Sequence, residues 1–229
     1  DLRPHGAGRR FPRMGQRARQ PLWHLASGSR SPHCRRRRCA ARDRFPGRIA
    51  DVWIVIECLF RQTYKADKII FTGVAGAVNN KLNVGDVVIS VDLVEHDFDT
   101  TAFGEKPGNV PGSDNGKFYA DQSLISLAET SAQKVLGKTH VFKGTIATGD
   151  QFIADKAKVK VLEETFGAWA VEMEGASVAH VAALYKVPFV VIRAISDKAD
   201  GSAHVTYDEF SNKAAENSIK IVNEMLKKM

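Results

Sequence analysis

Beyond residue 65, short β-branched runs alternate with segments of helical period, and this alternation is the feature that most constrains the fold. Strands are expected over residues 68–72, 84–91, 140–147, 168–173 and 189–195. Helices are expected over 124–135 with Gly137 as the stop, over 155–165, directly after Glu174, and from a capping box at Thr206 and Glu209. The small-residue stretch 73–77 is expected to be a turn, and 96–116 an ordered excursion from the core. This order favours an α/β fold.

The charge of the chain changes sign along its length. Residues 1–50 hold 14 of the 16 arginines and no lysine against two acids, a net charge of +12, whereas residues 51–229 carry −5. We therefore expect residues 1–60 to be an atypical Arg-rich segment, either disordered or mistranslated through a shifted reading frame or a wrong start. Residues 61–229 are then one domain that is incomplete at its N-terminal side. The alternative is a genuine Arg-rich tail that binds nucleic acid or a membrane surface.

The cysteines and the apolar runs limit the classes of protein to which the chain can belong. Cys34 and Cys39 lie near His33, but no second ligand pair stands at zinc-finger spacing, so no metal and no cofactor are expected. The acidic body beyond Cys58 has no cysteine, which fits a reducing cytoplasm. The run 51–60 is too short and too acidic to span a membrane, and no apolar run of a signal peptide is found.

Acidic residues follow the expected strand 168–173. If the strand persists, Glu172 and Glu174 point to one side and Met173 to the other. A ligand site at the end of the strand is one interpretation. The other is that these acids only stabilise the N-terminus of the following helix.

Two further polar clusters stand at expected strand ends, where open α/β sheets bind ligands. Arg193 interrupts an otherwise apolar strand and needs a carboxylate, for which Glu174 is a candidate. Ser196 and Asp197 end that strand, and burial favours a neutral aspartic acid that can donate a proton, although a helix or turn cap is the simpler interpretation. In the turn 148–153, Phe152 could stack on a flat base or belong to the core.

Six sequence blocks occur in the order typical of one family. They are TGVAGAV at 72–78, VGDVVIS at 84–90, HDFDTTAFG at 96–104, TGDQFI at 148–153, VEMEG at 171–175 and VPFVVIRAISDKAD at 187–200. Over residues 65–229 the chain resembles the bacterial 5′-methylthioadenosine/S-adenosylhomocysteine nucleosidases of the nucleoside phosphorylase superfamily. The resemblance implies a single three-layer αβα domain around a central mixed sheet. It also implies hydrolysis that releases adenine from a thio-substituted nucleoside.

The resemblance assigns the catalytic roles position by position. It implies that Asp197 protonates N7 of adenine, that Ser196 orients Asp197, and that Arg193 holds the local carboxylates. Glu174 hydrogen-bonds the ribose hydroxyls and stabilises an oxocarbenium-like sugar in the transition state. Met173 packs on the sugar.

The resemblance also assigns the substrate-binding residues. Phe152 stacks on adenine and the backbone of Ile153 reads its edge, while Val74, Ala75 and Gly76 line the site. Many relatives have serine where Val74 stands. Glu172 is placed among the substrate contacts as well. Phe103 and Pro111 match residues that family members lend to the neighbouring subunit, which implies a homodimer.

One family feature has no counterpart in this sequence. The family begins with a strand and an acidic run that contains the glutamate activating the attacking water. Residues 1–60 contain one glutamate, Glu57, which lies in an apolar run. We therefore expect impaired turnover, because general acid–base assistance contributes about 10²–10⁴ in rate.

Two other functions remain as alternatives. A purine or uridine phosphorylase shares the fold, but phosphate as nucleophile calls for arginines, and the body has only Arg61 and Arg193. A non-catalytic protein whose basic tail binds polyanions is the second alternative. Because the tail has no compositional continuity with the domain, a nucleic-acid partner is not expected.

Overall fold

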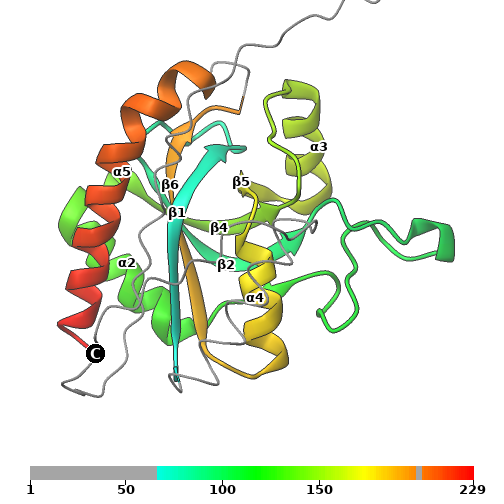
Figure 1. Cartoon of the computed structure of the whole chain (residues 1–229), viewed down its shortest axis with the longest axis horizontal. Coiled ribbons are helices and arrows are strands. Elements are labelled where there is room, and N and C mark those ends of the chain that lie inside the picture. Colours follow the sequence, from blue (N-terminus) through cyan, green and yellow to red (C-terminus); the bar gives the residue numbers. More distant parts are fainter. Residues whose placement is uncertain (1–65, 200–202) are drawn as a thin grey trace, which may run out of the picture.

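The predicted alternation of strands and helices is confirmed in the computed structural model (Figure 1), in which residues 66–199 and 203–229 are described. The strands are β1 (Ile69–Ala77), β2 (Val87–Glu95), β3 (Phe118–Tyr119), β4 (Val141–Thr148), β5 (Ala168–Glu172) and β6 (Phe189–Asp197). The α-helices are α2 (Gln122–Leu136), α3 (Lys156–Phe166), α4 (Gly175–Leu184) and α5 (Ala203–Leu226). The predictions for the Arg-rich segment, the three cysteines and Glu57 lie outside the described residues.

The strands form one mixed sheet that closes on itself. Its order is β3-β2-β4-β5-β1-β6, and an additional pairing joins β2 to β6. Strands β2, β4 and β5 run parallel to one another, and β1 runs parallel to β6. The two groups are antiparallel where they meet, at β1 with β5 and at β2 with β6. The sheet is therefore a ring of two parallel groups.

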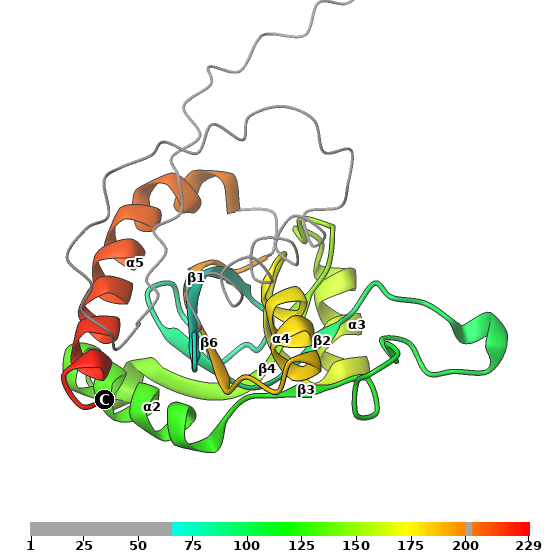
Figure 2. The same cartoon turned by 60° about the horizontal axis from the view of Figure 1, so that its bottom comes forward.

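Helices cover the sheet on two sides, and the predicted α/β fold with a central mixed sheet is confirmed. Figures 1 and 2 show α2 and α5 on one side and α3 and α4 on the other. Strand β6 is buried along its whole length, and its residues alternate between the two sides as far as Ile195, after which the register with β1 shifts by one residue. Val190 and Ile192 pack with α2 and α5, whereas Phe189 and Val191 pack with α4. Arg193 belongs to the α4 side by this alternation.

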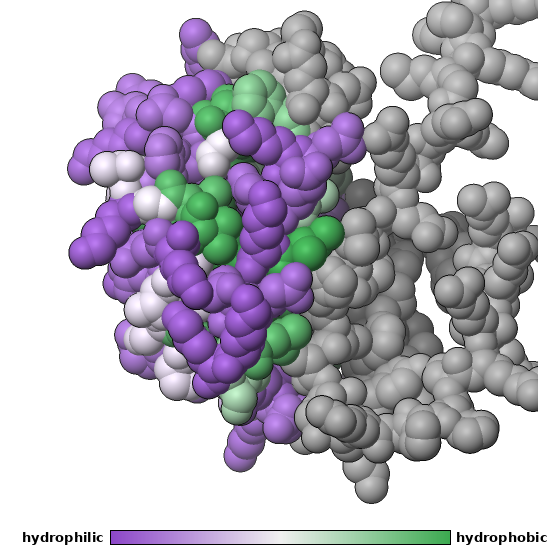
Figure 3. Space-filling model, turned by 90° about the vertical axis from the view of Figure 1, so that its left-hand side faces the viewer, coloured by the Kyte–Doolittle hydropathy of each residue, from purple (hydrophilic) through white to green (hydrophobic). Residues whose placement is uncertain are grey.

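The side that carries α5 and α2 is mainly hydrophilic (Figure 3). Lys134 of α2 lies 2.6 Å from the carboxylate of Glu224 on α5. Hydrogen bonds from Lys134 and then Lys227 lower the pKa of Glu224 to about 2. Within the described ranges, no helix combines the length and the apolar character that crossing a membrane requires.

Three predicted boundaries were wrong. The stretch 73–77 is not a turn, because β1 continues to Ala77, and Gly76 pairs with both β5 and β6. Strand β2 begins at Val87 and continues to Glu95, since its second half pairs with β4. Helix α5 begins at Ala203, so Thr206 lies inside the helix and not at its N-terminus. The predicted stop of α2 at Gly137 is confirmed.

The predicted excursion after residue 96 forms an arm that projects from the body (Figure 1). A short 3-10 turn, Thr101–Phe103, lies within it, and the Phe103 side chain is 87% exposed. The arm returns to the sheet through Lys117, whose ammonium group lies 3.2 Å from the buried carboxylate of Asp92 on β2.

Candidate active site

The three polar clusters meet around Gly76, near the end of β1. Gly76 pairs with Asp197 of β6 on one side and with Val171 of β5 on the other. Thr148 of β4 pairs in turn with Glu172. Because β1 and β5 are antiparallel and pair only through the last residues of β1, their carboxyl ends meet at this point. Asp197 and Val171 are thus two inter-strand spacings apart, about 10 Å between their Cα atoms.

Asp197 is buried, with 3% of its surface exposed, and both of its carboxylate oxygens accept hydrogen bonds. Oδ2 accepts from the Ser196 hydroxyl at 2.8 Å, and Oδ1 accepts from the Ala199 amide at 2.8 Å. A Cβ at residue 76 would lie 3.1 Å from Oδ1, so Gly76 allows the strand to approach this carboxylate closely. These hydrogen bonds hold the Asp197 side chain in place next to the end of β1.

Arg193 is the largest buried side chain with a charge, and three groups hold it. Its Nη2 donates to Oε2 of Glu172 and lies 3.6 Å from Oε2 of Glu174. Its guanidinium carbon lies 4.4 Å from the centroid of the Phe71 ring, a cation–π contact. Glu174 was the predicted partner, but Glu172 makes the closer pair because Glu172 is buried on the same side of the sheet.

Glu172 is held by protein donors on both carboxylate oxygens. The Thr148 hydroxyl donates to Oε1, and the Gly175 amide lies 2.9 Å from Oε1 and 2.8 Å from Oε2. Gly175 begins α4, so the carboxylate also lies at the positive end of that helix. This carboxylate therefore stabilises the N-terminus of α4, as in the alternative interpretation, and its placement among the substrate contacts stays a prediction.

Glu174 is more accessible, with 30% of its side chain exposed. Burial raises the pKa of the Glu174 carboxyl above its ordinary value, Arg193 opposes the rise, and the Glu172 carboxylate adds to it. An ionised Glu174 is therefore poorly solvated in the free protein. A cation placed beside it would relieve that cost.

The raised pKa of Glu174 gives a testable stability effect. In the unfolded chain the carboxyl ionises near 4.5, so above that pH the native state retains a proton that the unfolded state has lost. The free energy of unfolding contributed by this group must then fall as the pH rises through that window. We expect Glu174→Gln to gain stability relative to wild type as the pH is raised from 4.5, in urea unfolding at a series of pH values. If the wild type instead became more stable relative to the variant over this pH range, the raised pKa of Glu174 would be contradicted.

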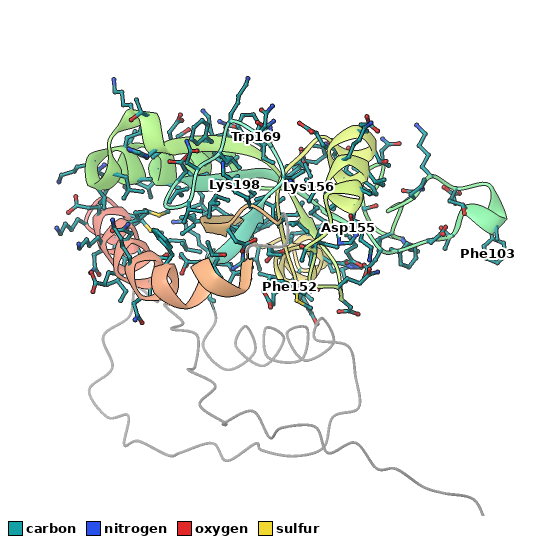
Figure 4. The ribbon with its side chains drawn as sticks, turned by 90° about the horizontal axis from the view of Figure 1, so that it is seen from above. Phe103, Phe152, Asp155, Lys156, Trp169 and Lys198 are labelled. Atoms are coloured by element: carbon teal, nitrogen blue, oxygen red, sulfur yellow. The ribbon has the colours of Figure 1, made fainter. Side chains whose placement is uncertain are left out.

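The other predicted residues divide between the body and the arm. Ala75 and Ile153 are buried, Val74 and Met173 are half-buried, and Phe152 is 54% exposed. Phe103 and Pro111 are exposed on the arm. Figure 4 shows Phe103 at the far end of the arm, remote from Phe152. A single copy of the chain does not bring these two groups together.

Two residues at the site carried no assignment from the sequence. Phe71 lies under Arg193, and Thr148 donates to Glu172. Phe71 shares a face of β1 with Gly73, where a Cβ would lie 1.8 Å from Nη1 of Arg193. In the sequence, the glycine two residues after Phe71 was the signal that a large side chain could lie against this face of the strand. Thr148 is the last residue of an apolar strand, and nothing in its spacing distinguishes it from a core threonine.

Comparison with known proteins identifies the family. The model of the phosphorylase superfamily matches residues 50–227. The 5′-methylthioadenosine/S-adenosylhomocysteine nucleosidase of Bacillus subtilis is 45% identical over 172 residues, which are 75% of this chain and 74% of that protein. The chain belongs to the methylthioadenosine/S-adenosylhomocysteine nucleosidases of the phosphorylase superfamily.

Solved structures of such nucleosidases have the same fold. The nucleosidase of Neisseria meningitidis, in complex with methylthio-immucillin-A, has a TM-score of 0.75 and 38% identity and covers 80% of this chain and 79% of that one. The S-adenosylhomocysteine nucleosidase of Streptococcus pyogenes, in complex with 5-methylthiotubericidin, has a TM-score of 0.74 and 35% identity, with coverages of 80% and 77%. These findings give no support to the phosphorylase or polyanion-binding alternatives.

Proposed function

We propose that this chain hydrolyses the N-glycosidic bond of 5′-methylthioadenosine and S-adenosylhomocysteine and releases adenine. One observation carries the proposal: Asp197 with Ser196, and Arg193 with Glu172 and Glu174, border the same strand tip at Gly76. An acid on one flank of this tip and a carboxylate group on the other suit a ligand with a basic ring at one end and a hydroxylated sugar at the other.

Asp197 acts as the general acid at the base end. Protonated, it donates its proton to N7 of adenine, so that the purine leaves as a neutral base when the C–N bond breaks. The Ser196 hydroxyl, 2.8 Å from Oδ2, orients the carboxyl group. Phe152 stacks on the adenine ring and the Ile153 backbone hydrogen-bonds its edge.

Glu174 acts at the sugar end. As the bond breaks, positive charge develops on the ribose, and an ionised Glu174 hydrogen-bonded to the ribose hydroxyls stabilises that charge more in the transition state than in the ground state. Burial, which raises the pKa of Glu174, makes the gain from a neighbouring cation larger. Arg193 and Glu172 keep the carboxylate in place, while Met173, Val74 and Ala75 line the cavity.

We also propose that the active assembly is a homodimer in the cytoplasm. Phe103 and Pro111, exposed on the arm, would complete the alkylthio end of the partner's site. An 87% exposed phenylalanine on a projecting arm is suited to burial against another surface. The nucleosidase domain would begin near residue 61.

Adenine release tests this function. The full chain is incubated with each nucleoside, with and without inorganic phosphate, and the products are quantified by mass spectrometry. We expect adenine and the free thio-sugar at a rate that phosphate does not change. A phosphorylated thio-sugar, or the absence of adenine after long incubation at high enzyme concentration, would refute the proposal.

The same assay tests the expected loss of the water-activating glutamate. With the Bacillus subtilis relative assayed in parallel, we expect this chain to be slower by about 10²–10⁴, because water must attack without a general base. Turnover equal to that of the relative would show that another group activates the water.

A further inference from the structure

A single buried hydroxyl connects three elements of the site. Thr148 ends β4 with 3% of its surface exposed. Its Oγ1 lies 2.8 Å from the Ala176 amide in the first turn of α4 and donates to Oε1 of Glu172 at the end of β5. An amide can only donate and a carboxylate can only accept, so the hydroxyl proton must point at Glu172. The partners of Thr148 therefore fix the direction of both hydrogen bonds.

Thr148 also lies between the turn that carries Phe152 and the group formed by Glu172, Arg193 and Glu174. Its carbonyl accepts from the His96 amide at 2.9 Å, and the next residue, Gly149, donates to the Glu172 carbonyl at 3.2 Å. The turn 149–153, which carries Phe152, continues from this point. On the other side, Glu172 holds Arg193, which lies 3.6 Å from Glu174.

We propose that Thr148 is a positioning residue for the reaction, an inference that rests on the proposed function. Its hydroxyl fixes the rotamer of Glu172, Glu172 fixes Arg193, and Arg193 fixes the carboxylate of Glu174 beside the sugar. Without the hydroxyl, the Ala176 amide loses its acceptor and Oε1 of Glu172 loses a donor, both in a buried environment. Glu172 and Arg193 would then rearrange, and Glu174 would lose its support.

The affected step is the chemistry, and binding of the base is largely retained. Glu174 acts on charge that develops in the transition state, whereas the backbone bonds of 148 and 149 that place the adenine turn do not involve the hydroxyl. A change confined to the hydroxyl should therefore lower kcat with little change in KM.

The test compares Thr148→Val, which removes the hydroxyl, with Thr148→Ser, which keeps it. We expect kcat for adenine release to fall about 10- to 100-fold in the valine variant with KM within about threefold of wild type, since a bond to a charged group is lost. The serine variant should retain wild-type values. If thermal unfolding shows that Thr148→Val does not fold, Thr148→Ala replaces it.

Calorimetric binding of methylthio-immucillin-A separates the two proposals. Equal kcat and equal affinity in the folded valine and serine variants, with an active wild type, would overturn the positioning role. A wild type that binds this probe but never releases adenine refutes the proposed function, and the positioning role falls with it because that role is stated for the same reaction. A wild type that neither binds nor cleaves overturns both.

Discussion

Replacing Asp197 with asparagine is expected to slow adenine release by about 10²–10⁴ while leaving the protein folded, because the variant lacks the proton that makes adenine a leaving group. Asparagine keeps the shape of the side chain, and its amide oxygen can still accept from the Ala199 amide, which lies 2.8 Å from Oδ1 in the wild type. The loss should therefore appear in kcat. Adenine is quantified by mass spectrometry at high enzyme concentration, alongside thermal unfolding of both proteins.

Asp155→Asn is the matched control for Asp197→Asn. Asp155 is exposed and caps α3 by accepting from the Ala157 amide at 2.8 Å. Asparagine caps helices about as well as aspartate, so this variant makes the same chemical change at an exposed acid to which no role in the reaction is assigned. It should retain wild-type kcat. A loss of less than tenfold in Asp197→Asn would mean that another group protonates the base, or that protonation is not required.

Replacing Gly73 with alanine is expected to produce the largest loss of stability. The added Cβ would lie 1.8 Å from Nη1 of Arg193, a distance that no contact between unbonded atoms allows. Arg193 would have to leave its place above Phe71 and release Glu172, which then stays buried without its cation. Breaking a buried ion pair costs about 3–5 kcal/mol, and adenine release should fall with it. The free energy of unfolding in urea measures the effect.

Gly137→Ala supplies the comparison for Gly73→Ala. Gly137 has a φ of 89° at the end of α2, and a Cβ there meets no atom of the described residues within 4 Å. The added methyl group strains only the backbone, at a cost of about 1–3 kcal/mol, because φ 89° with ψ 155° is a region that glycine alone readily occupies. If both alanine variants lose the same free energy of unfolding, the contact between Gly73 and Arg193 does not constrain the core.

The local pattern of the sequence was sufficient to predict the helices and strands but not the way in which the strands pair. Gly137 and the strand 189–195 were predicted because a helix stop and a continuous apolar run are signals within a few residues. The stretch 73–77 was misassigned as a turn because small residues are typical of turns. In the fold, Gly73 and Gly76 make room for Arg193 and Asp197 on the neighbouring strand β6. The pairing of β2 with β6, which closes the sheet, has no local signal.

The residues of the site could be predicted from the sequence better than the contacts between them. Strand ends and the six blocks pointed to Asp197, Arg193 and Glu174. Spacing alone could not show that Glu172 is the closer partner of Arg193, because that depends on the position of the α4 N-terminus under its carboxylate. The contribution of Thr148 depends on the same three-dimensional arrangement, since its partners are 24 and 28 residues away.

A crystal structure of the Asp197→Asn variant with 5′-methylthioadenosine bound tests the central claim most directly. The account predicts N7 of adenine within hydrogen-bonding distance of the residue 197 side chain and the ribose hydroxyls on the Glu174 carboxylate, in one cavity bordered by Gly76. A nucleoside bound with its base away from residue 197, or with its sugar away from Glu174, would contradict it.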